Sequence, residues 1–285
     1  MKIKEFIPPV LLNCIYNIFG LLGISQWKYM KEGFNYQVKS EGWDMSEIAQ
    51  VQYNKWDAYR KYISTTRPFA INHEGPVSDM VVDPFYHNLL NSFAHILCLA
   101  SIGKSRIKFL DWGGGLGHYG LLAKTVLSST DLSIDYYCYD FEPFCNYGRK
   151  VNPEFTYESD AQKLLGNKYD LILASSSIWY EKEWRNGIDT LSKYTTDYLY
   201  ITRMIFVEHV PSFVALQQPD YMGYKTEYLF WIINRSEFLN YMQTRGFNLI
   251  REFEFGKVTP IYRAPENGSM KGFLFKKISS LESDV

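Results

Sequence analysis

The segment IKFLDWGGGLG, residues 107–117, joins an apolar run to a cluster of glycines. Residues 107–111 have the length and composition of a short buried strand, and residues 116–127 predict a helix directly after the glycines. A ligand must approach the backbone closely where a chain turns from a strand into a helix, and a side chain there would collide with it. The segment therefore predicts a ligand-binding turn at the carboxyl end of a buried strand.

Strands and helices alternate downstream of this turn. Further strands are predicted at residues 134–139, 155–157, 169–174 and 198–202, and helices at residues 144–150 and 181–194. This alternation is typical of a parallel sheet that is covered by helices on both faces. At the C-terminal end, a predicted helix is followed by two strands with a turn-rich loop between them, at residues 236–245, 247–255 and 271–277. We therefore expect an α/β fold whose mostly parallel, seven-stranded sheet ends in an antiparallel hairpin.

Two helices are predicted before the first strand. Asp44 and Glu47 have the spacing of a capping box, and Asp83 followed by Pro84 is a typical helix start. The first helix has an apolar stripe at helical spacing, formed by Ala49, Tyr53, Trp56, Tyr59 and Ile63. The second has an equivalent stripe, formed by Phe85, Leu89, Phe93, Ile96 and Ala100. We expect residues 1–104 to form a helical extension that caps a substrate site on a domain of residues 105–285.

The N-terminal segment raises the question of a membrane contact. Residues 7–24 are largely apolar, but two prolines and two asparagines interrupt them, so the run is too short and polar for a span of about 20 apolar residues. An amphipathic helix fits this composition better. It either packs on the body of the protein or lies at a membrane surface, where nearby lysines would meet anionic headgroups, namely Lys2, Lys4, Lys28 and Lys31.

Composition limits the class of protein. The 285 residues are 46% hydrophobic and 21% charged, which is ordinary for a soluble globular chain with a sizeable core. The formal net charge of −1 provides no field that attracts phosphates, so we expect no nucleic-acid partner. The 4 cysteines contain no Cys-x-x-Cys pair and the 5 histidines are scattered. We therefore expect no metal site and a cytoplasmic protein with free thiols.

The pattern Asp111-x-Gly113-x-Gly115-x-Gly117 resembles the first motif of class I S-adenosylmethionine-dependent methyltransferases. The resemblance implies a Rossmann-like fold in which this loop backs the methionine part and the ribose of S-adenosylmethionine. A rival frame, Gly115-x-Gly117-x-x-Gly120, matches the dinucleotide pattern, in which the first glycine should follow the strand almost directly. Here several residues intervene, and an acidic residue at the strand end suits a zwitterionic amino acid better than a pyrophosphate. A glycine-rich turn without a ligand is the third interpretation.

Three later segments match further positions of the methyltransferase class. Asp140 ends the second strand, where the resemblance implies a carboxylate that accepts both ribose hydroxyls, and Glu142 is the reserve candidate. Asp160 and Ala161 follow the third strand and resemble the segment that holds the adenine amine, although Asp160 could equally cap the next turn. Ser175 begins a run of serines after the fourth strand. These serines should line the bottom of the site, or they serve only as turn formers. The terminal antiparallel pair separates a methyltransferase from a plain nucleotide-binding fold.

The chain is also similar to a narrower bacterial family of methyltransferases, many of which belong to surface-polysaccharide gene clusters. The likeness covers most of the chain and is carried by the proline-containing apolar N-terminus and by five segments: GWDMS (42–46), LDWGG (110–114), SSS (175–177), ITR (201–203) and GFLFKK (272–277). It implies O-methylation of a sugar or glycan precursor, with S-adenosylmethionine as the cofactor. Where that family carries Arg-Thr-Pro and Tyr-Pro-x-Trp, this chain has RMI (203–205) and EYLFW (227–231). Both departures fall where a substrate would bind, so the resemblance does not fix the substrate.

Four side chains near the predicted strand ends are candidates for catalysis. Methyl transfer is an in-line displacement, so the protein must align the nucleophile and, for a hydroxyl, remove its proton. His209 closely follows the fifth strand and is the candidate base, with Glu208 to orient it; a surface histidine is the plain alternative. Arg203 could hold an acidic or phosphorylated sugar or pair with a nearby acid, and Tyr180 is the next candidate for proton transfer. His118, inside the glycine turn, could face the cofactor.

Two other functions remain open at this point. One is a non-catalytic scaffold that keeps the nucleotide-type fold at a membrane assembly complex, and the other is an NAD(P)-binding oxidoreductase. The glycine loop together with Asp111 and Asp140 favours the methyltransferase, because a protein that no longer binds a cofactor would not need that combination of residues. The expected partner is a small-molecule or glycan substrate.

Overall fold

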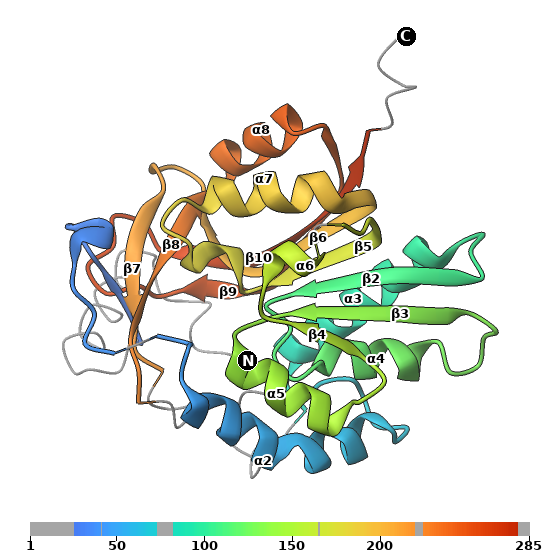
Figure 1. The fold of residues 1–285 in the computed structure, drawn as a ribbon. Helices are drawn as coiled ribbons and strands as arrows, with labels where there is room; N and C mark the ends of the chain where they lie inside the picture. Colours follow the sequence, from blue (N-terminus) through green and yellow to red (C-terminus); the bar gives the residue numbers. More distant parts are fainter. Residues whose placement is uncertain (1–25, 41, 73–81, 165, 220–224, 279–285) are drawn as a thin grey trace, which may run out of the picture.

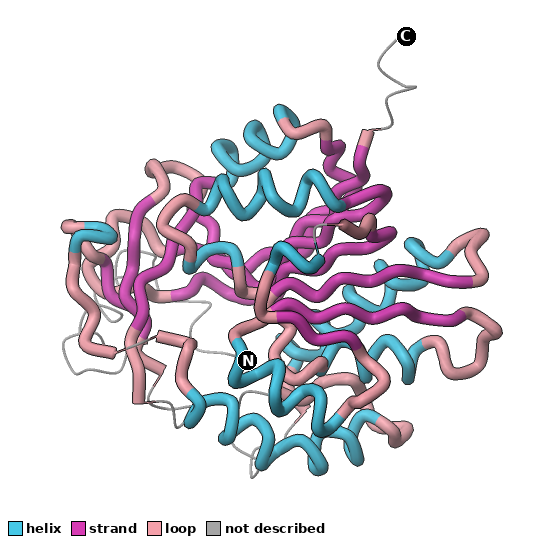
Figure 2. The backbone as a smooth tube through the Cα atoms, viewed as in Figure 1, coloured by secondary structure: helices cyan, strands magenta, loops and turns pink. Residues whose placement is uncertain are grey.

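The computed structural model describes residues 26–40, 42–72, 82–164, 166–219 and 225–278. They form one sheet with helices on both faces, as Figure 1 and Figure 2 show. Its ten strands are β1 (Trp27–Tyr29), β2 (Arg106–Trp112), β3 (Ser133–Tyr139), β4 (Thr156–Glu158), β5 (Tyr169–Ser175), β6 (Thr195–Val207), β7 (Phe213–Gln217), β8 (Tyr228–Asn234), β9 (Phe247–Thr259) and β10 (Gly268–Lys277). The helices are α2 (Ser46–Ile63), α3 (Pro84–Ser101), α4 (His118–Val126), α5 (Glu142–Val151), α6 (Ala161–Leu164), α7 (Trp184–Tyr194) and α8 (Arg235–Thr244), with short 3-10 helices η2 (Gly33–Asn35) and η4 (Ile178–Tyr180). The strand–helix alternation predicted from residue 107 onward is confirmed.

Most of the sheet is parallel. Seven strands follow one another in the order β4-β3-β2-β5-β6-β10-β9. The first five are parallel to one another, whereas β10 is antiparallel to both of its neighbours, β6 and β9. The predicted C-terminal antiparallel pair is therefore confirmed. Because parallel strands end at the same edge of a sheet, the carboxyl ends of β2, β3 and β5 lie close together, and β6 passes beside the end of β5 at Thr202.

The predicted number of seven strands is wrong, because β1, β7 and β8 extend the sheet. Strand β8 is parallel to the last two residues of β6, Phe206 and Val207, and β7 and β1 follow it as antiparallel neighbours. The reason is the length of β6, which continues past residue 202, where the strand was expected to end. The N-terminal extension is also not purely helical, since Trp27 pairs with Gln217 of β7.

Each face of the sheet packs against its own group of helices. Successive residues of β2 point to opposite faces, so that Phe109 joins the core with α2, α3 and α4, and Leu110 joins the core with α7 and α8. Figure 1 shows these two groups of helices on opposite sides of the sheet. Phe93 of α3 contacts Phe109 with 5.5 Å between ring centroids. Each such side chain stabilises the fold by about 1.5–3 kcal/mol, so β2 and the turn that follows it rest on a rigid base.

The starts of the two N-terminal helices differ from each other. Asp83 caps α3 as predicted, because its Oδ1 accepts the backbone N–H of Phe85 at 2.8 Å. The capping box expected at Asp44 and Glu47 is not formed. The N-cap residue of α2 is Met45, which has no side chain that can accept the orphan N–H groups, and no side-chain cap hydrogen bond is made.

The N-terminal apolar segment at residues 7–24 lies outside the described residues, so its amphipathic helix and its membrane contact stay predictions. Of the lysines expected near headgroups, Lys28 and Lys31 are described, and both are exposed. No helix within the described ranges is long and apolar enough to cross a bilayer.

Candidate functional site

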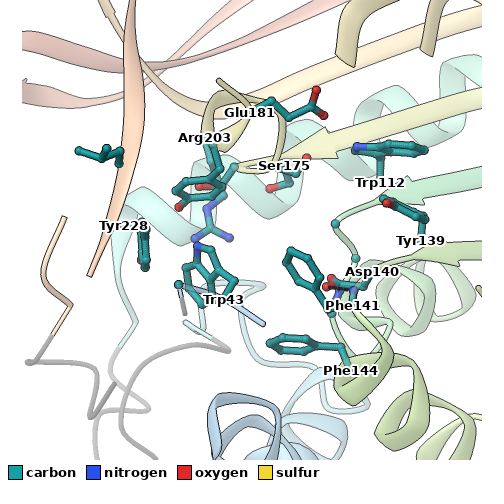
Figure 3. Close-up of a pocket in the computed structure, with 18 of the residues that line it drawn as sticks. Trp43, Trp112, Tyr139, Asp140, Phe141, Phe144, Ser175, Glu181, Arg203 and Tyr228 are labelled. Atoms are coloured by element: carbon teal, nitrogen blue, oxygen red, sulfur yellow. Dashed lines mark hydrogen bonds between the residues drawn. The ribbon is translucent and has the colours of Figure 1, made fainter. Parts of the chain in front are cut away.

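A cavity of about 660 Å³ opens at the carboxyl ends of β2, β3 and β5. The last residues of these strands, Trp112, Tyr139 and Ser175, all line it. One side, here called the glycine wall, consists of Trp112–Gly115, Tyr139–Phe141 and Phe144. The other side, here called the aromatic wall, consists of Trp43, Tyr180, Arg203 and Tyr228. Figure 3 shows Asp140, Phe141 and Phe144 on one side of the cavity and Trp43, Arg203 and Tyr228 on the other.

Within the glycine wall, residues 113–115 expose backbone rather than side chains to the cavity. Gly113 and Gly115 have φ values of +78° and +59°, a region that other residues rarely adopt. The N–H of Gly113 donates to the carbonyl of Tyr139 at 2.8 Å, which fixes the start of the turn against β3. A side chain at Gly113 would run into Ser177. The predicted ligand-binding turn is thus a turn with open backbone that faces a cavity.

Asp140 follows β3 and holds the glycine turn from the side. Its Oδ2 accepts the N–H of Gly115 at 2.7 Å, and its Oδ1 accepts the N–H of Phe141 at 2.7 Å. Burial raises the pKa of Asp140 to about 6, although both N–H donors act in the opposite direction. Because each carboxylate oxygen offers two acceptor positions, both oxygens can still take a further donor. Asp140 lines the cavity, so such a donor can come from a ligand.

Asp111 was expected to face a ligand, but it lies fully buried beneath the glycine turn and does not line the cavity. Tyr136 donates its hydroxyl to Oδ2 at 2.7 Å, while Oδ1 has no hydrogen-bond partner among the described residues. Burial raises the pKa of this carboxyl to about 7. A side chain at Gly114 would collide with it. Asp111 therefore supports the turn from below, and its side chain is not part of the cavity lining.

The remaining glycines of the motif serve packing. A Cβ at Gly117 would collide with the hydroxyl of Tyr157, and one at Gly120 would lie 2.8 Å from Phe155. Neither glycine lines the cavity, which corrects the expectation for Gly117. In the dinucleotide pattern the second glycine lets the pyrophosphate approach the backbone. Tyr157 covers Gly117 here, so the geometry favours the frame in which residues 113–115 meet the ligand.

Two residues at the other side of the cavity have a left-handed backbone that is unusual outside glycine. Ser176, which follows β5, has φ +57°, and Arg203, inside β6, has φ +58°. They lie side by side, because the N–H of Ser176 donates to the carbonyl of Thr202 at 2.9 Å. Such a conformation costs about 1–3 kcal/mol and is concentrated at functional sites. Both residues line the cavity, so the strain coincides with the aromatic wall.

The three rings of the aromatic wall come from segments that are distant in sequence. Trp43 precedes α2, Tyr180 ends η4 and Tyr228 begins β8. The ring of Tyr228 lies 4.9 Å from that of Trp43 and 5.0 Å from that of Tyr180, measured between centroids. Ser40 ties the N-terminal segment in place, because its Oγ accepts the N–H of Glu227 at 2.8 Å. The N-terminal extension therefore forms part of the site.

Glu208 and His209 do not occupy the predicted catalytic position. Both are exposed, and neither lines the cavity. The carboxylate of Glu208 pairs with Lys271 at 3.2 Å, and the backbone N–H of His209 donates to Glu266 at 2.9 Å. Strand β6 runs on to Val207, so residues expected just past the end of the strand lie beyond the site. The role of general base predicted for His209 is not supported by its position.

The segment predicted to hold the adenine does not line the cavity, whereas the serine that follows the fourth predicted strand does. Asp160 and Ala161 do not line the cavity, and Asp160 accepts the N–H of Gln162 at 2.9 Å at the start of α6. The interpretation of Asp160 as a cap is therefore the one that the structure shows. Ser175 does line the cavity, and its hydroxyl lies 3.2 Å from that of Tyr119. His118, expected to face a cofactor, lines the cavity as well.

Sequence reasoning missed Gln52, a buried residue of α2 that lines the cavity beside the glycine turn. It is 4% exposed, and its Oε1 lies 3.2 Å from the place of a Cβ on Gly115. This oxygen has no hydrogen-bond partner among the residues that the structure describes. The sequence did contain a signal for Gln52, because it is a polar residue one turn before Trp56, on the buried face of the predicted helix. Tyr53, assigned to that face instead, is exposed.

Glu181, which directly follows η4, was also missed. Its segment contains no motif, so only the fold brings it to the cavity. Burial raises the pKa of its carboxyl to about 7. Figure 3 shows this carboxylate on the side of the cavity where Trp112 lies. Glu181 is therefore a carboxyl with a raised pKa beside the glycine wall.

Comparison with known proteins gives similarity at the level of solved structures. No family model matches the chain, and a search of curated proteins finds no match. An S-adenosylmethionine-dependent methyltransferase from Clostridium acetobutylicum aligns over 80% of this chain and 99% of its own, with 11% identity and a TM-score of 0.47. The 1,6-didemethyltoxoflavin-N1-methyltransferase of Burkholderia thailandensis, with S-adenosylhomocysteine bound, aligns over 82% of this chain and 90% of its own, with 12% identity and a TM-score of 0.44. Identities and TM-scores this low do not carry an activity from these enzymes to this chain.

Proposed function

We propose that this protein is a methyltransferase that binds S-adenosylmethionine against the glycine wall. The observation that carries the proposal is the pairing of residues 113–115 with Asp140. Backbone without side chains faces the cavity there, and a carboxylate with acceptor positions to spare stands beside it. The antiparallel strand β10 beside β6 supports the proposal, because such a terminal pair distinguishes a methyltransferase from a plain nucleotide-binding sheet.

The residues of the glycine wall suit this cofactor. Asp140 would accept the ribose hydroxyls, and residues 113–115 leave room for the methionine part. Gln52 offers a buried amide oxygen, without a partner among the described residues, that would accept from the amino group of the cofactor. When bound, the cofactor supplies a methyl group on a sulfonium centre, which a nucleophile displaces in line.

The aromatic wall would hold the acceptor, on the side of the cavity opposite Asp140 (Figure 3). The family resemblance implies a hydroxyl of a sugar or glycan precursor, and we retain that acceptor within the proposal. Tyr180 belongs to this wall, so we assign to it the proton exchange once expected of His209. Tyr180→Phe should lower turnover of a hydroxyl acceptor by about 10²-fold or more at unchanged cofactor affinity. Unchanged turnover in Tyr180→Phe would indicate that catalysis comes from the alignment of the acceptor with the methyl group and needs no proton transfer by Tyr180.

Calorimetric titration tests the proposal. S-adenosylmethionine and its demethylated product, S-adenosylhomocysteine, should each bind with one-to-one stoichiometry and a Kd in the range of about 1 μM to 1 mM. NADH should give no heat of binding under the same conditions. Binding of NADH without binding of S-adenosylmethionine would instead support the dinucleotide frame. Absence of binding by all three compounds would contradict the proposal and favour a scaffold.

A further inference from the structure

We propose that a second cavity, next to the one described above, binds an uncharged ring of the acceptor that lies beyond the ring with the reacting hydroxyl. This inference rests on the proposed function and names the class of the acceptor, a molecule of at least two rings. The second cavity has a volume of about 350 Å³. That volume falls within the range of about 300–1,000 Å³ that is typical of small-molecule pockets.

The second cavity adjoins the first at the aromatic wall. All four residues of this wall line both cavities, and so does Ser176. Ser176 and Arg203 both have a left-handed backbone, with φ values of +57° and +58°, so the strained segment lies where the two cavities meet. A molecule that extends from one cavity into the other therefore lies beside Tyr180, the residue to which we assign the proton exchange.

Among the described residues, those that line the second cavity alone carry no charge. They are Gln26, Trp27, Phe85, Tyr86, Trp179, Gln217, Gly256, Thr259 and Met270. Four of them are aromatic. A charged group that entered this part of the cavity would lose its hydration at a large cost in free energy, whereas an uncharged ring can stack on the aromatic faces. The lining therefore favours an uncharged ring.

Trp179 supplies a hydrogen-bond donor to the lining of the second cavity. It lies in the middle of η4 and is 2% exposed, and its ring packs on Phe230 with 4.8 Å between ring centroids. Its indole N–H has no hydrogen-bond partner within the described part of the chain. A buried donor without a partner costs about 1–3 kcal/mol. A bound ring that carries a hydroxyl or ether oxygen can supply the missing acceptor.

Gly256 of β9 provides a means to fill the second cavity without touching the first. A Cβ at this position would lie 3.7 Å from Phe85, which lines the same cavity. That distance is ordinary van der Waals contact, and the backbone of Gly256 is not left-handed, so a side chain is tolerated here without strain. A larger side chain at residue 256 would therefore occupy the second cavity and leave the glycine wall unaltered.

Ligand-observed NMR on the full chain tests the inference, in the presence and in the absence of S-adenosylhomocysteine. Methyl glucoside is the probe with one ring, and phenyl glucoside and methyl cellobioside are the uncharged probes with two. At least one of these two should bind at least about tenfold more tightly than methyl glucoside. Phenyl glucoside against methyl cellobioside identifies the second ring as aromatic or as a sugar. The para-carboxyphenyl glucoside should show no such gain, because its second ring carries a charge.

Two variants assign the gain in affinity to the second cavity. Gly256→Val should abolish the tenfold gain while leaving the Kd for S-adenosylhomocysteine unchanged. Trp179→Phe should reduce the gain by about threefold or more, because the indole donor is lost.

Two matched controls line neither cavity. A Cβ at Gly166 would meet no atom within 4 Å, so Gly166→Val adds the same side chain elsewhere. Trp184 is 1% exposed, and its indole N–H likewise has no partner among the described residues, so Trp184→Phe removes an equivalent donor. Both controls should bind the probes as the wild type does. Thermal melting establishes that each variant is folded, and the comparison of probes on the wild type needs no variant.

Each outcome decides one claim. Equal binding of the probes with one and two rings to the wild type, with or without S-adenosylhomocysteine, overturns the inference. A gain that survives in Gly256→Val, or is undiminished in Trp179→Phe, overturns it as well, because the second ring then lies elsewhere. An equal gain for the para-carboxyphenyl glucoside overturns the uncharged class. Failure of the wild type to bind S-adenosylhomocysteine contradicts the proposed function, whereas the gain from the second ring is still measured on the protein alone.

Discussion

The glycine wall is held by contacts between neighbouring strand ends, whereas the aromatic wall is held by residues from opposite ends of the chain. In the glycine wall, Gly115 and Asp140 are 25 positions apart and joined by a hydrogen bond of 2.7 Å. Beside Tyr228 of the aromatic wall, Lys39 and Glu227 are 188 positions apart and joined by a hydrogen bond of 2.7 Å. The first wall therefore forms with the parallel sheet, and the second requires the N-terminal segment to dock on β8. We expect the two walls to respond separately to substitution.

Gly115→Val should have the largest effect and should damage the glycine wall alone. A branched side chain would enter a left-handed backbone and fill space beside Gln52. The Kd for S-adenosylmethionine should rise by about 100-fold or more, equivalent to about 2.7 kcal/mol. Calorimetry measures the affinity, and circular dichroism establishes that the variant is folded.

Gly103→Val is the matched control for this prediction. Gly103 also has a left-handed backbone, with φ +73°, but a Cβ there would meet no atom within 4 Å. The variant shares the backbone strain and should keep the wild-type Kd. A folded Gly115→Val protein with normal affinity would remove the glycine wall from the site.

Asp140→Ala should weaken S-adenosylmethionine binding by about tenfold or more, because two ribose hydroxyls lose a charged acceptor. Glu142→Ala provides the control. Glu142 pairs with Arg149 at 3.1 Å and does not line the cavity, so its removal should leave the Kd unchanged. Loss of affinity in Glu142→Ala instead of Asp140→Ala would move the ribose site by two residues. Both titrations use calorimetry.

Cofactor affinity should also depend on pH through Asp140, whose pKa is raised to about 6. Ionised Asp140 is the form that accepts two hydroxyls, so the Kd should change little above pH 7 and rise by up to about tenfold per pH unit below pH 6. Asp140→Asn cannot titrate and should give weaker binding with a flatter profile. A flat wild-type profile between pH 7.5 and 5 would contradict this role.

The same pKa has the opposite consequence for the stability of the protein without ligand. A carboxyl whose pKa is raised on folding contributes stability that is fully present below its unfolded value near pH 4 and is lost as the pH rises through about 6. Urea unfolding at pH 5 and pH 7.5 should therefore show the wild type losing stability relative to Asp140→Asn as the pH rises. A constant difference between the two proteins would contradict the raised pKa.

Ser40→Ala should have the smallest effect and should touch the aromatic wall alone. Its hydroxyl accepts the N–H of Glu227 at 2.8 Å and lies 2.8 Å from the hydroxyl of Thr226. Loss of this tie should cost about 1 kcal/mol, or about 2–4 °C in Tm, with the Kd for S-adenosylmethionine unchanged. Exposed Ser128→Ala is the control and should leave Tm unchanged. A fall in cofactor affinity in Ser40→Ala would show that the walls are not independent.

The same difference between the walls explains what could be predicted from the sequence. The glycine turn, Asp140 and the alternation of strands and helices follow from local patterns, since periodicity and turn composition are properties of short segments. The depth of Asp111 and the cover over Gly117 could not be predicted, because Tyr136 and Tyr157 come from other strands. A short motif predicts which residues lie close together, but it does not predict which of them faces the ligand.

Tyr180 and Arg203 were predicted as site residues, but the arrangement of the aromatic wall could not be predicted because its contacts are long-range. The position of His209 relative to the cavity depends on how far β6 extends, and the part of β6 beyond residue 202 pairs with β10 and β8. Gln52, which lies beside the glycine turn, was missed although a polar residue on a buried helix face was visible in the sequence. Arg203 was singled out by its position after the fifth predicted strand, but the shift in register between β6 and β10 at this point is a property of strand pairing.

A crystal structure of the protein with S-adenosylhomocysteine tests the central claim most directly. The account predicts the ribose hydroxyls within hydrogen-bond distance of Asp140, the amino-acid part over residues 113–115, and the sulfur directed toward the aromatic wall. Ligand density outside this cavity, or a ribose that contacts residues other than Asp140, would contradict it.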